Sequence, residues 1–204
     1  MRILLINPPN CGRSIPEERY GIDSLKQIFR GEPLALQTLA GNLREHDVSI
    51  VDLKAAPDIL DEILKTVSPD MVGFTAMTCE VNTVLALARQ VRNTCSASIV
   101  VGGCHASCRP EDFNHPEIDW IVVGLGTVAL RELAEALEQG AHPQVDGVAP
   151  TSPGGELHWK ARAYTGADAG DNTAPRYDLV KGYRSQYYLA SLGLQMGLVS
   201  SAIG

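Results

Sequence analysis

Four short apolar runs in this chain each end in glycine, proline or small polar residues. The runs span residues 2–6, 70–74, 97–101 and 119–123. Their length and composition predict buried β-strands. The third run leads directly into Gly102 and Gly103, where the lack of side chains lets another backbone or a large flat ligand approach closely. The pattern therefore predicts a buried sheet with a ligand site along one edge.

Segments of helical periodicity separate the strands. Apolar residues recur at helical spacing in residues 34–46, 57–67, 81–91 and 127–137. Pro57 suits a first helical turn. A fifth strand is predicted at residues 48–52, and only a short turn at residues 110–114 separates the last two strands. Alternation of this kind predicts an α/β, doubly wound (Rossmann-like or flavodoxin-like) five-stranded parallel sheet with helices on both faces. Ligands of such sheets bind at the carboxyl edge, near the switch point.

Two segments depart from the alternation. The connection at residues 10–32 is far longer than the ~2–6 residues usual after a strand. Because it leaves from the carboxyl edge, we interpret it as a lid rather than a tolerated surface insertion. From residue 141 onward, proline and glycine interrupt the chain and the periodicity fades. We therefore expect one domain at residues 1–140 and a linker or extension at residues 141–204.

Composition and charge exclude several classes of protein. The 204 residues carry a net charge of -7 and contain no basic run, which argues against nucleic acid as a partner. No apolar run approaches the ~20 residues of a membrane span, so we expect no membrane span and a cytoplasmic location. The five cysteines include no Cys-x-x-Cys pair. We expect reduced thiols, and no zinc site at Cys104 and Cys108, because a second pair of ligands is missing.

The exit of the first strand excludes the familiar ligands of this fold class. A dinucleotide fold needs Gly-x-Gly-x-x-Gly there, whereas this chain has Asn7, Pro8 and Pro9. The chain also lacks a P-loop, a hydroxyl-rich phosphate loop of the flavodoxin type and the acidic cluster of a response regulator. What remains is a site built from close backbone and small hydroxyl groups at the strand exits. Such a site suits a bulky ligand with a long tail.

Residues 3–9, 72–76, 100–106 and 119–124 match one known family in order and spacing. On these stretches the chain resembles the N-terminal cobalamin-binding domain of B12-dependent radical SAM enzymes. The likeness covers residues 1–140 well and residues 141–204 loosely. Residues 174–179 resemble the segment that leads out of this domain in the family. The resemblance implies cobalamin as the cofactor and a radical SAM domain of the same protein as the partner.

The resemblance also implies roles for individual residues. Gly102 and Gly103 would let the corrin or its tail approach the backbone, while Thr75 and Thr78 would donate hydrogen bonds to the tail. His105, a lone histidine, is expected to contact the tail or a loop carbonyl rather than to ligate cobalt. The expected cofactor-binding residues are Asn7, Pro8, Pro9, Thr75, Ala76, Met77, Thr78, Gly102, Gly103, Cys104, His105, Gly124, Leu125 and Gly126.

Three features of the sequence differ from related cobalamin domains. Residues 7–12 lack the Asp-x-His-x-x-Gly motif of methionine-synthase-like domains, so we expect histidine-off cobalamin with its nucleotide tail detached from cobalt and buried. Residues 124–127 read Gly-Leu-Gly-Thr where the family has Gly-Glu-Gly-Glu, which leaves the role of this loop open. The family's Cys-x-x-x-Cys-x-x-Cys motif is missing. We therefore expect the chain to be cut at a domain boundary, with the [4Fe–4S] cluster and SAM in an absent C-terminal domain.

Three functions stay open at this point. The first is the cobalamin-binding part of a radical SAM methyltransferase or a related enzyme that forms C–C bonds. The second is a stand-alone cobalamin carrier or sensor, and the third is a cofactor-free docking domain. The chain contains no paired catalytic acid and base and no activated nucleophile, so we expect the isolated chain to be inactive. Asp52 and Glu80 are expected to be a strand-end charge and a helix N-terminal charge.

Overall fold

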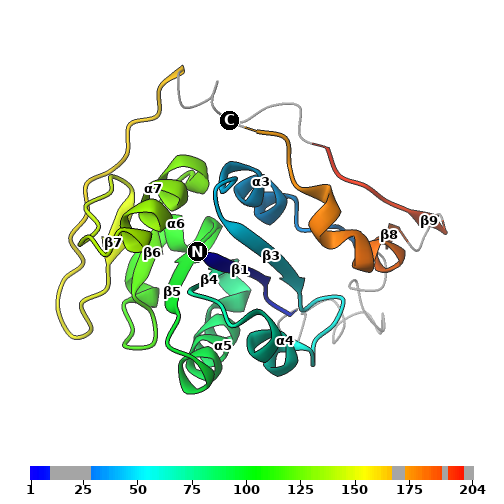
Figure 1. The fold of residues 1–204 in the computed structure, drawn as a ribbon, viewed down its shortest axis with the longest axis horizontal. Coiled ribbons are helices and arrows are strands. Elements are labelled where there is room, and N and C mark those ends of the chain that lie inside the picture. Colours follow the sequence, from blue (N-terminus) through cyan, green and yellow to red (C-terminus); the bar gives the residue numbers. More distant parts are fainter. Residues whose placement is uncertain (10–28, 167–172, 190–192, 200–204) are drawn as a thin grey trace, which may run out of the picture.

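A six-stranded sheet organises the molecule (Figure 1). The computed structural model describes residues 1–9, 29–166, 173–189 and 193–199. The strand order is β3-β1-β4-β5-β6-β7, and all neighbouring pairs are parallel except β6 with β7. The strands are β1 (Arg2–Asn7), β3 (Asp47–Asp52), β4 (Met71–Thr75), β5 (Ser98–Gly102), β6 (Trp120–Val122) and β7 (Val148–Pro150).

Helices cover both faces of the sheet (Figure 1). Helices α3 (Leu34–Asn42) and α7 (Gly126–Glu138) pack on one face, while α4 (Leu60–Val67) and α5 (Val81–Thr94) pack on the other. The remaining elements are short. They are η1 (Thr78–Glu80), α6 (Cys104–Cys108), η2 (Pro110–Phe113), η3 (Tyr177–Gln186), and a small antiparallel sheet of β2 (Phe29–Arg30), β8 (Tyr188–Leu189) and β9 (Leu194–Gln195).

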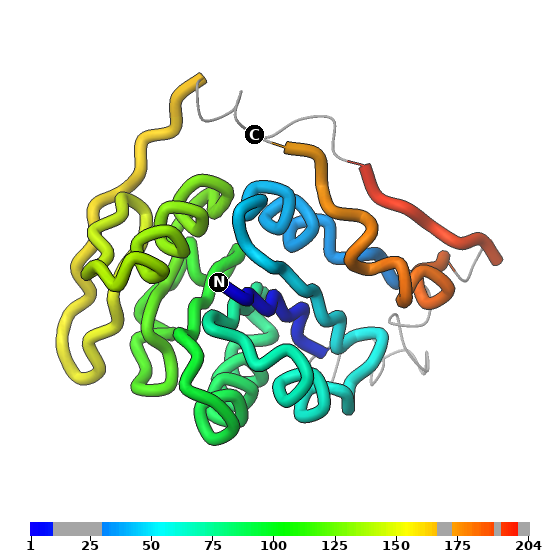
Figure 2. The backbone as a smooth tube through the Cα atoms, in the orientation of Figure 1, coloured from blue at the N-terminus to red at the C-terminus, as the bar shows by residue number. Residues whose placement is uncertain are grey.

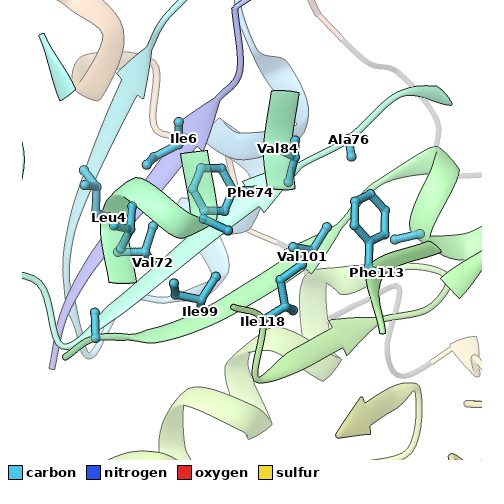
Figure 3. Close-up of a cluster of buried hydrophobic side chains, with 14 of the residues drawn as sticks. Leu4, Ile6, Val72, Phe74, Ala76, Val84, Ile99, Val101, Phe113 and Ile118 are labelled. Carbon is cyan, nitrogen blue, oxygen red and sulfur yellow. The ribbon is translucent and has the colours of Figure 1, made fainter. Parts of the chain in front are cut away.

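Strand alternation divides the core into two layers. Ile3 and Leu5 of β1 face the layer under α3 and α7, whereas Leu4 and Ile6 face the layer under α4 and α5. Figure 3 shows the second layer, with Val72, Phe74 and other apolar side chains packed beneath the helices. Because both faces are covered, the central strands read as almost continuous apolar runs.

The predicted fold class is confirmed, with differences in individual elements. A sixth strand, β7, extends the five predicted parallel strands and pairs antiparallel with β6. Helix α4 begins at Leu60 instead of near Pro57, because residues 53–58 form turns first. Helix α6 occupies Cys104–Cys108, where the sequence pattern predicted no helix. The predicted lid at residues 10–32 lies mostly outside the described residues.

The described C-terminal segment packs against the domain (Figure 2). Val180 in η3 is completely buried and Tyr187 is 1% exposed, both in the layer that contains α3. The Leu198 amide donates a hydrogen bond of 2.7 Å to the carboxylate of the buried Glu32. The boundary near residue 140 stays a prediction, but residues beyond it contribute to the core.

A buried carboxylate joins this segment to the sheet. Asp52 at the end of β3 is completely buried, and its carboxylate accepts hydrogen bonds from the Asn7 amide (2.8 Å), the Lys54 backbone N–H (3.0 Å) and the Tyr187 hydroxyl (3.0 Å). A buried carboxylate is tolerable when donors surround it. Asp52 is therefore more than a strand-end charge, because it connects the ends of β1 and β3 to the C-terminal segment.

Replacing Tyr187 with phenylalanine removes the hydroxyl that Asp52 Oδ2 accepts from. We expect Tyr187→Phe to lower the free energy of unfolding by about 1–3 kcal/mol, because a buried acceptor loses its partner. Urea denaturation measures this loss. Tyr177→Phe is the control, since its half-buried hydroxyl bonds a loop carbonyl instead of a buried carboxylate, and we expect a loss below about 0.5 kcal/mol. Equal decreases in the free energy of unfolding of the two variants would contradict the role of Asp52 as a buried acceptor that needs the Tyr187 hydroxyl.

Alkaline pH tests the same contact. Burial and then the charge of Asp52 raise the pKa of the Tyr187 hydroxyl. The folded state therefore keeps this proton above about pH 10, where an unfolded tyrosine loses it. The resulting stability is present below pH 10 and declines as the pH rises further. We expect unfolding free energies measured from pH 8 to 11 to fall less steeply for Tyr187→Phe than for the native chain.

Candidate functional site

The strand order reverses between β1 and β4, and this position marks the candidate site. β3 lies on one side of β1, and β4 with the rest of the sheet lies on the other. The connections leaving the carboxyl ends of β1 and β4 therefore diverge to opposite sides, which opens a crevice at that edge of the sheet. The exits of β4, β5 and β6 all meet this edge.

A cavity of about 540 Å³ extends from this edge down between the sheet and helices α3 and α7. The sheet contributes Leu5, Gly73, Val100 and Val122 to its floor. The described residues that line it are mostly apolar, and none of them is charged. The other lining residues are Ala35, Leu36, Thr38, Leu39, Phe74, Thr75, Gly102, Gly103, Cys104, Ser107, Cys108, Gly124, Leu125, Gly126, Thr127 and Leu130.

Glycines create the space at the cavity floor and mouth. A Cβ on Gly73, in the middle of β4, would lie 2.9 Å from Leu5 Cδ2. A Cβ on Gly126 would lie 3.3 Å from Leu39 Cδ2, at the point where α7 begins. By contrast, a Cβ on Gly102 would meet Val122 Cβ at an ordinary 3.6 Å. Side chains at Gly73 and Gly126 would therefore crowd the cavity wall, while a Cβ at Gly102 would make only ordinary van der Waals contacts.

Gly103 holds two loops together at the cavity mouth. Its φ of +100° is a conformation that residues with a Cβ rarely adopt. A Cβ there would lie 2.8 Å from both Ala76 N and Thr75 Oγ1. The neighbouring backbones are joined by hydrogen bonds from the Ala76 amide to Gly102 O (2.9 Å) and from the His105 amide to Ala76 O (3.1 Å). Glycine is thus required here by the close approach of two backbones.

Ser107 connects the third loop to this assembly. Its hydroxyl donates to Gly103 O at 3.0 Å and accepts from the Gly124 amide at 2.9 Å. The Tyr164 hydroxyl also hydrogen-bonds Leu125 O. We call residues 75–80, 102–108 and 124–127 the rim. These bonds fix the rim before any ligand arrives, which lowers the cost of ordering it on binding.

The structure brings half of the predicted cofactor-binding residues to the cavity wall. Those that line it are Thr75, Gly102, Gly103, Cys104, Gly124, Leu125 and Gly126. The other predicted residues lie outside it. Asn7 is buried and donates to Asp52; Pro8, Ala76 and His105 are also buried, while Met77 and Thr78 are exposed on the rim and Pro9 follows β1. Their contacts with a cofactor stay predictions.

Glu80, at the end of residues 75–80, holds this part of the rim in place. It is 3% exposed, accepts a hydrogen bond of 2.9 Å from the Met77 amide, and forms a 2.9 Å ion pair with Lys54 Nζ. Because the Met77 amide precedes η1, this contact agrees with the predicted helix N-terminal role. The charge of Glu80 thus fixes the loop after β4.

Sequence reasoning missed the depth of the cavity. The residues it did not identify include Leu5, Leu36, Leu39, Val100, Val122 and Leu130, which looked like ordinary core positions. One signal was available, because Gly73 interrupts an otherwise apolar strand and such a glycine often marks a close approach. The distance between helix and sheet that leaves the cavity open is a tertiary property.

Comparison with known proteins identifies the family. Residues 26–134 match the B12 binding domain family, so the chain belongs to this family. This finding confirms the predicted resemblance. Two curated relatives are 34% identical over 152 residues and 30% identical over 162 residues. They are the uncharacterized methyltransferase PH0819 of Pyrococcus horikoshii and the anaerobic magnesium-protoporphyrin IX monomethyl ester cyclase of Synechocystis sp..

The alignments cover 69% and 73% of this chain but only 30% of either relative. Two solved structures share the fold. The cobalamin-dependent radical enzyme OxsB matches with a TM-score of 0.67 at 20% identity, over 91% of this chain and 25% of that chain. The methyltransferase TsrM of Kitasatospora setae matches with a TM-score of 0.63 at 22% identity, over 85% of this chain and 31% of that chain. The chain thus resembles the N-terminal cobalamin domain of B12-dependent radical SAM enzymes.

Gly102 offers a clean test of the cavity mouth. We expect Gly102→Val to weaken cobalamin affinity by about tenfold or more, because the added methyl groups fill the mouth without a backbone clash. A fluorescence-quenching titration measures the affinity. Gly182→Val is the matched control, because a Cβ at this exposed position meets nothing within 4 Å. Unchanged affinity in Gly102→Val would remove this cavity from the binding site.

Gly103→Val is a poorer test. Its Cβ would collide with the Ala76 backbone, so loss of binding would accompany a distorted rim.

Proposed function

We propose that this chain binds cobalamin, with the nucleotide tail in the cavity and the corrin ring over the rim. The observation that carries this proposal is the deep apolar cavity that opens at the carboxyl edge between the exits of β4, β5 and β6, the last two of which contain glycines. Its volume of about 540 Å³ lies within the range usual for small-molecule sites, roughly 300–1,000 Å³. It suits the tail of cobalamin and leaves the larger corrin outside.

The residues that line the cavity match the chemistry of this tail. The floor and the helix side chains offer an apolar slot for a flat aromatic base, while Thr38, Thr75 and Thr127 supply hydroxyl groups at its wall. Helix α7 begins at Gly126, so the positive end of its dipole lies at the cavity mouth, where a phosphate is stabilised. The space beside Gly102, which a side chain would fill, leaves room for the corrin ring to approach the backbone.

Cobalamin bound here would supply methyl-transfer or one-electron chemistry at cobalt. The residues of this chain bind and orient it and exclude water from the tail. No histidine lines the cavity among the described residues, and both ring nitrogens of His105 are already within hydrogen-bond distance of Thr78 and Asp112. This arrangement supports a histidine-off, tail-off state, in which no histidine of the described residues ligates cobalt and the tail occupies the cavity.

The chain acts, in this proposal, as a carrier that presents the corrin to a separate catalytic unit. One curated relative is named a methyltransferase and another a cyclase, and the chain spans less than a third of either. These names favour a methyltransferase or cyclase as the catalytic unit, and the likeness to the radical SAM enzymes OxsB and TsrM favours one of the radical SAM type. A stand-alone carrier uses the same binding site, whereas a cofactor-free docking domain requires no such cavity.

The test is direct loading of the purified chain with hydroxocobalamin. After removal of the excess by gel filtration, we expect about one equivalent to remain bound, since the chain has one cavity of this kind among its described residues. The visible spectrum should be that of a tail-off cobalamin. A chain that elutes without colour would overturn the proposal and favour a docking domain. Retained colour with the spectrum of tail-ligated cobalamin would keep the binding but reject the tail-in-cavity arrangement.

A further inference from the structure

A series of hydrogen bonds links three polar side chains and ends at Thr78 in the rim. Asp112 in η2 lies 2.9 Å from His105 Nε2, and His105 Nδ1 lies 3.2 Å from the Thr78 hydroxyl. His105 is 6% exposed, and its ring packs edge-on against Phe113 with the centroids 5.6 Å apart. The imidazole thus cannot rotate freely between its two partners. This hydrogen-bonded series runs from the exposed Asp112 carboxylate to the exposed Thr78 hydroxyl.

Which group donates in each of these two hydrogen bonds follows from the chemistry of the three side chains. An ionised carboxylate only accepts hydrogen bonds, so Asp112 requires the proton on His105 Nε2. In the neutral imidazole, Nδ1 is then an acceptor. The Thr78 hydroxyl must donate its single hydrogen to Nδ1. Its oxygen is left with lone pairs, so toward a ligand Thr78 acts as an acceptor.

Thr78 lies where a ligand on the rim would meet it. It follows the exposed Met77, at the start of η1, after the exit of β4. The hydrogen bond from the His105 amide to Ala76 O and the close packing of Gly103 on Ala76 hold this loop beside Cys104, which lines the cavity mouth. A large ring that covers the mouth therefore extends toward the Thr78 hydroxyl.

We propose that Thr78, oriented by His105 and Asp112, selects a ligand that presents an N–H donor, namely a primary amide on the edge of an amidated corrinoid. This inference rests on the proposed cobalamin binding and identifies the substituent that the site recognises. A carboxylate at the same place on the ligand would set two acceptors against each other, and the hydroxyl could not turn to donate without breaking its bond to His105. Sites built for one hydrogen-bond polarity discriminate strongly against the other.

The experiment compares cobalamin with its b-, d- and e-monocarboxylic acids, each with one propionamide hydrolysed. Affinities are measured at pH 8 for the native chain. We expect one isomer to bind at least about tenfold more weakly than cobalamin, because its carboxylate faces Thr78. Equal affinities for cobalamin and all three acids would overturn the inference while leaving the proposed function intact. A native chain that binds none of the four would overturn both.

Variants assign the discrimination to Thr78. Thr78→Val should bring the affinity ratio between cobalamin and the weak isomer close to one, and Thr78→Ser should retain it. Thr94→Val is the matched control, because its exposed hydroxyl bonds a backbone carbonyl at the far end of α5. A ratio that survives in Thr78→Val would overturn the inference, since the discrimination would then arise elsewhere.

Asp112→Ala tests whether Asp112 orients the Thr78 hydroxyl through His105 or only stabilises the fold. Asp112 is an exposed residue that positions Thr78 through His105, so its removal should bring the affinity ratio between cobalamin and the weak isomer toward one. Long-range ¹H–¹⁵N spectra of the imidazoles supply a readout that needs no ligand. We expect the Nε2–H tautomer of His105 in the native chain and a mixture in Asp112→Ala. A native Nδ1–H tautomer would overturn the inference, because Thr78 would then be free to donate.

Discussion

The backbone contact between the exits of β4 and β5 is the constraint on which the site depends. Gly103 approaches Ala76 so closely that a single added carbon would lie 2.8 Å from the Ala76 nitrogen. This contact holds the loop after β4 against the short helix α6, and Ser107 then joins both to the loop after β6. Three strand exits thereby form one preorganised rim. A protein without this contact could keep the same sheet and still lose the mouth of the cavity.

The cavity beneath the rim is a gap in one of the two core layers. The layer under α4 and α5 is closed by large side chains such as Phe74 and Phe113, both almost fully buried (Figure 3). In the layer under α3 and α7, Gly73 stands where a larger residue would fill the space against Leu5. Unfilled apolar space lowers the stability of the free chain, and a ligand that occupies it restores the lost contacts and stabilises the fold by mass action.

The strands and the strand exits could be predicted because burial on both faces leaves a clear apolar run, and glycine directly after such a run marks a close approach of backbone or ligand. The rim residues Thr75, Gly102 and Gly124 were found this way and do line the cavity.

Helix α6 was missed because its five residues are too few to show periodicity. Strand β7 was missed for the same reason, since three residues ending in Pro150 carry little pattern. The cavity floor could not be predicted, because Leu5 and Val100 have the same sequence signature whether a helix or a ligand covers them.

The buried carboxylates of Asp52 and Glu80 connect the rim to the C-terminal segment. The Tyr187 hydroxyl bonds Asp52, and the Lys54 backbone bonds the same carboxylate while its ammonium group pairs with Glu80. Glu80 in turn holds the Met77 amide, so continuous polar contacts run from Tyr187 to the loop after β4. If Tyr187 moved away, Asp52 would lose one of its three hydrogen-bond donors, and the end of β3 with its following turn would shift to satisfy the carboxylate again. Such a shift would reach Lys54 and the rim. The position of the C-terminal segment and the shape of the rim are therefore physically linked through Asp52.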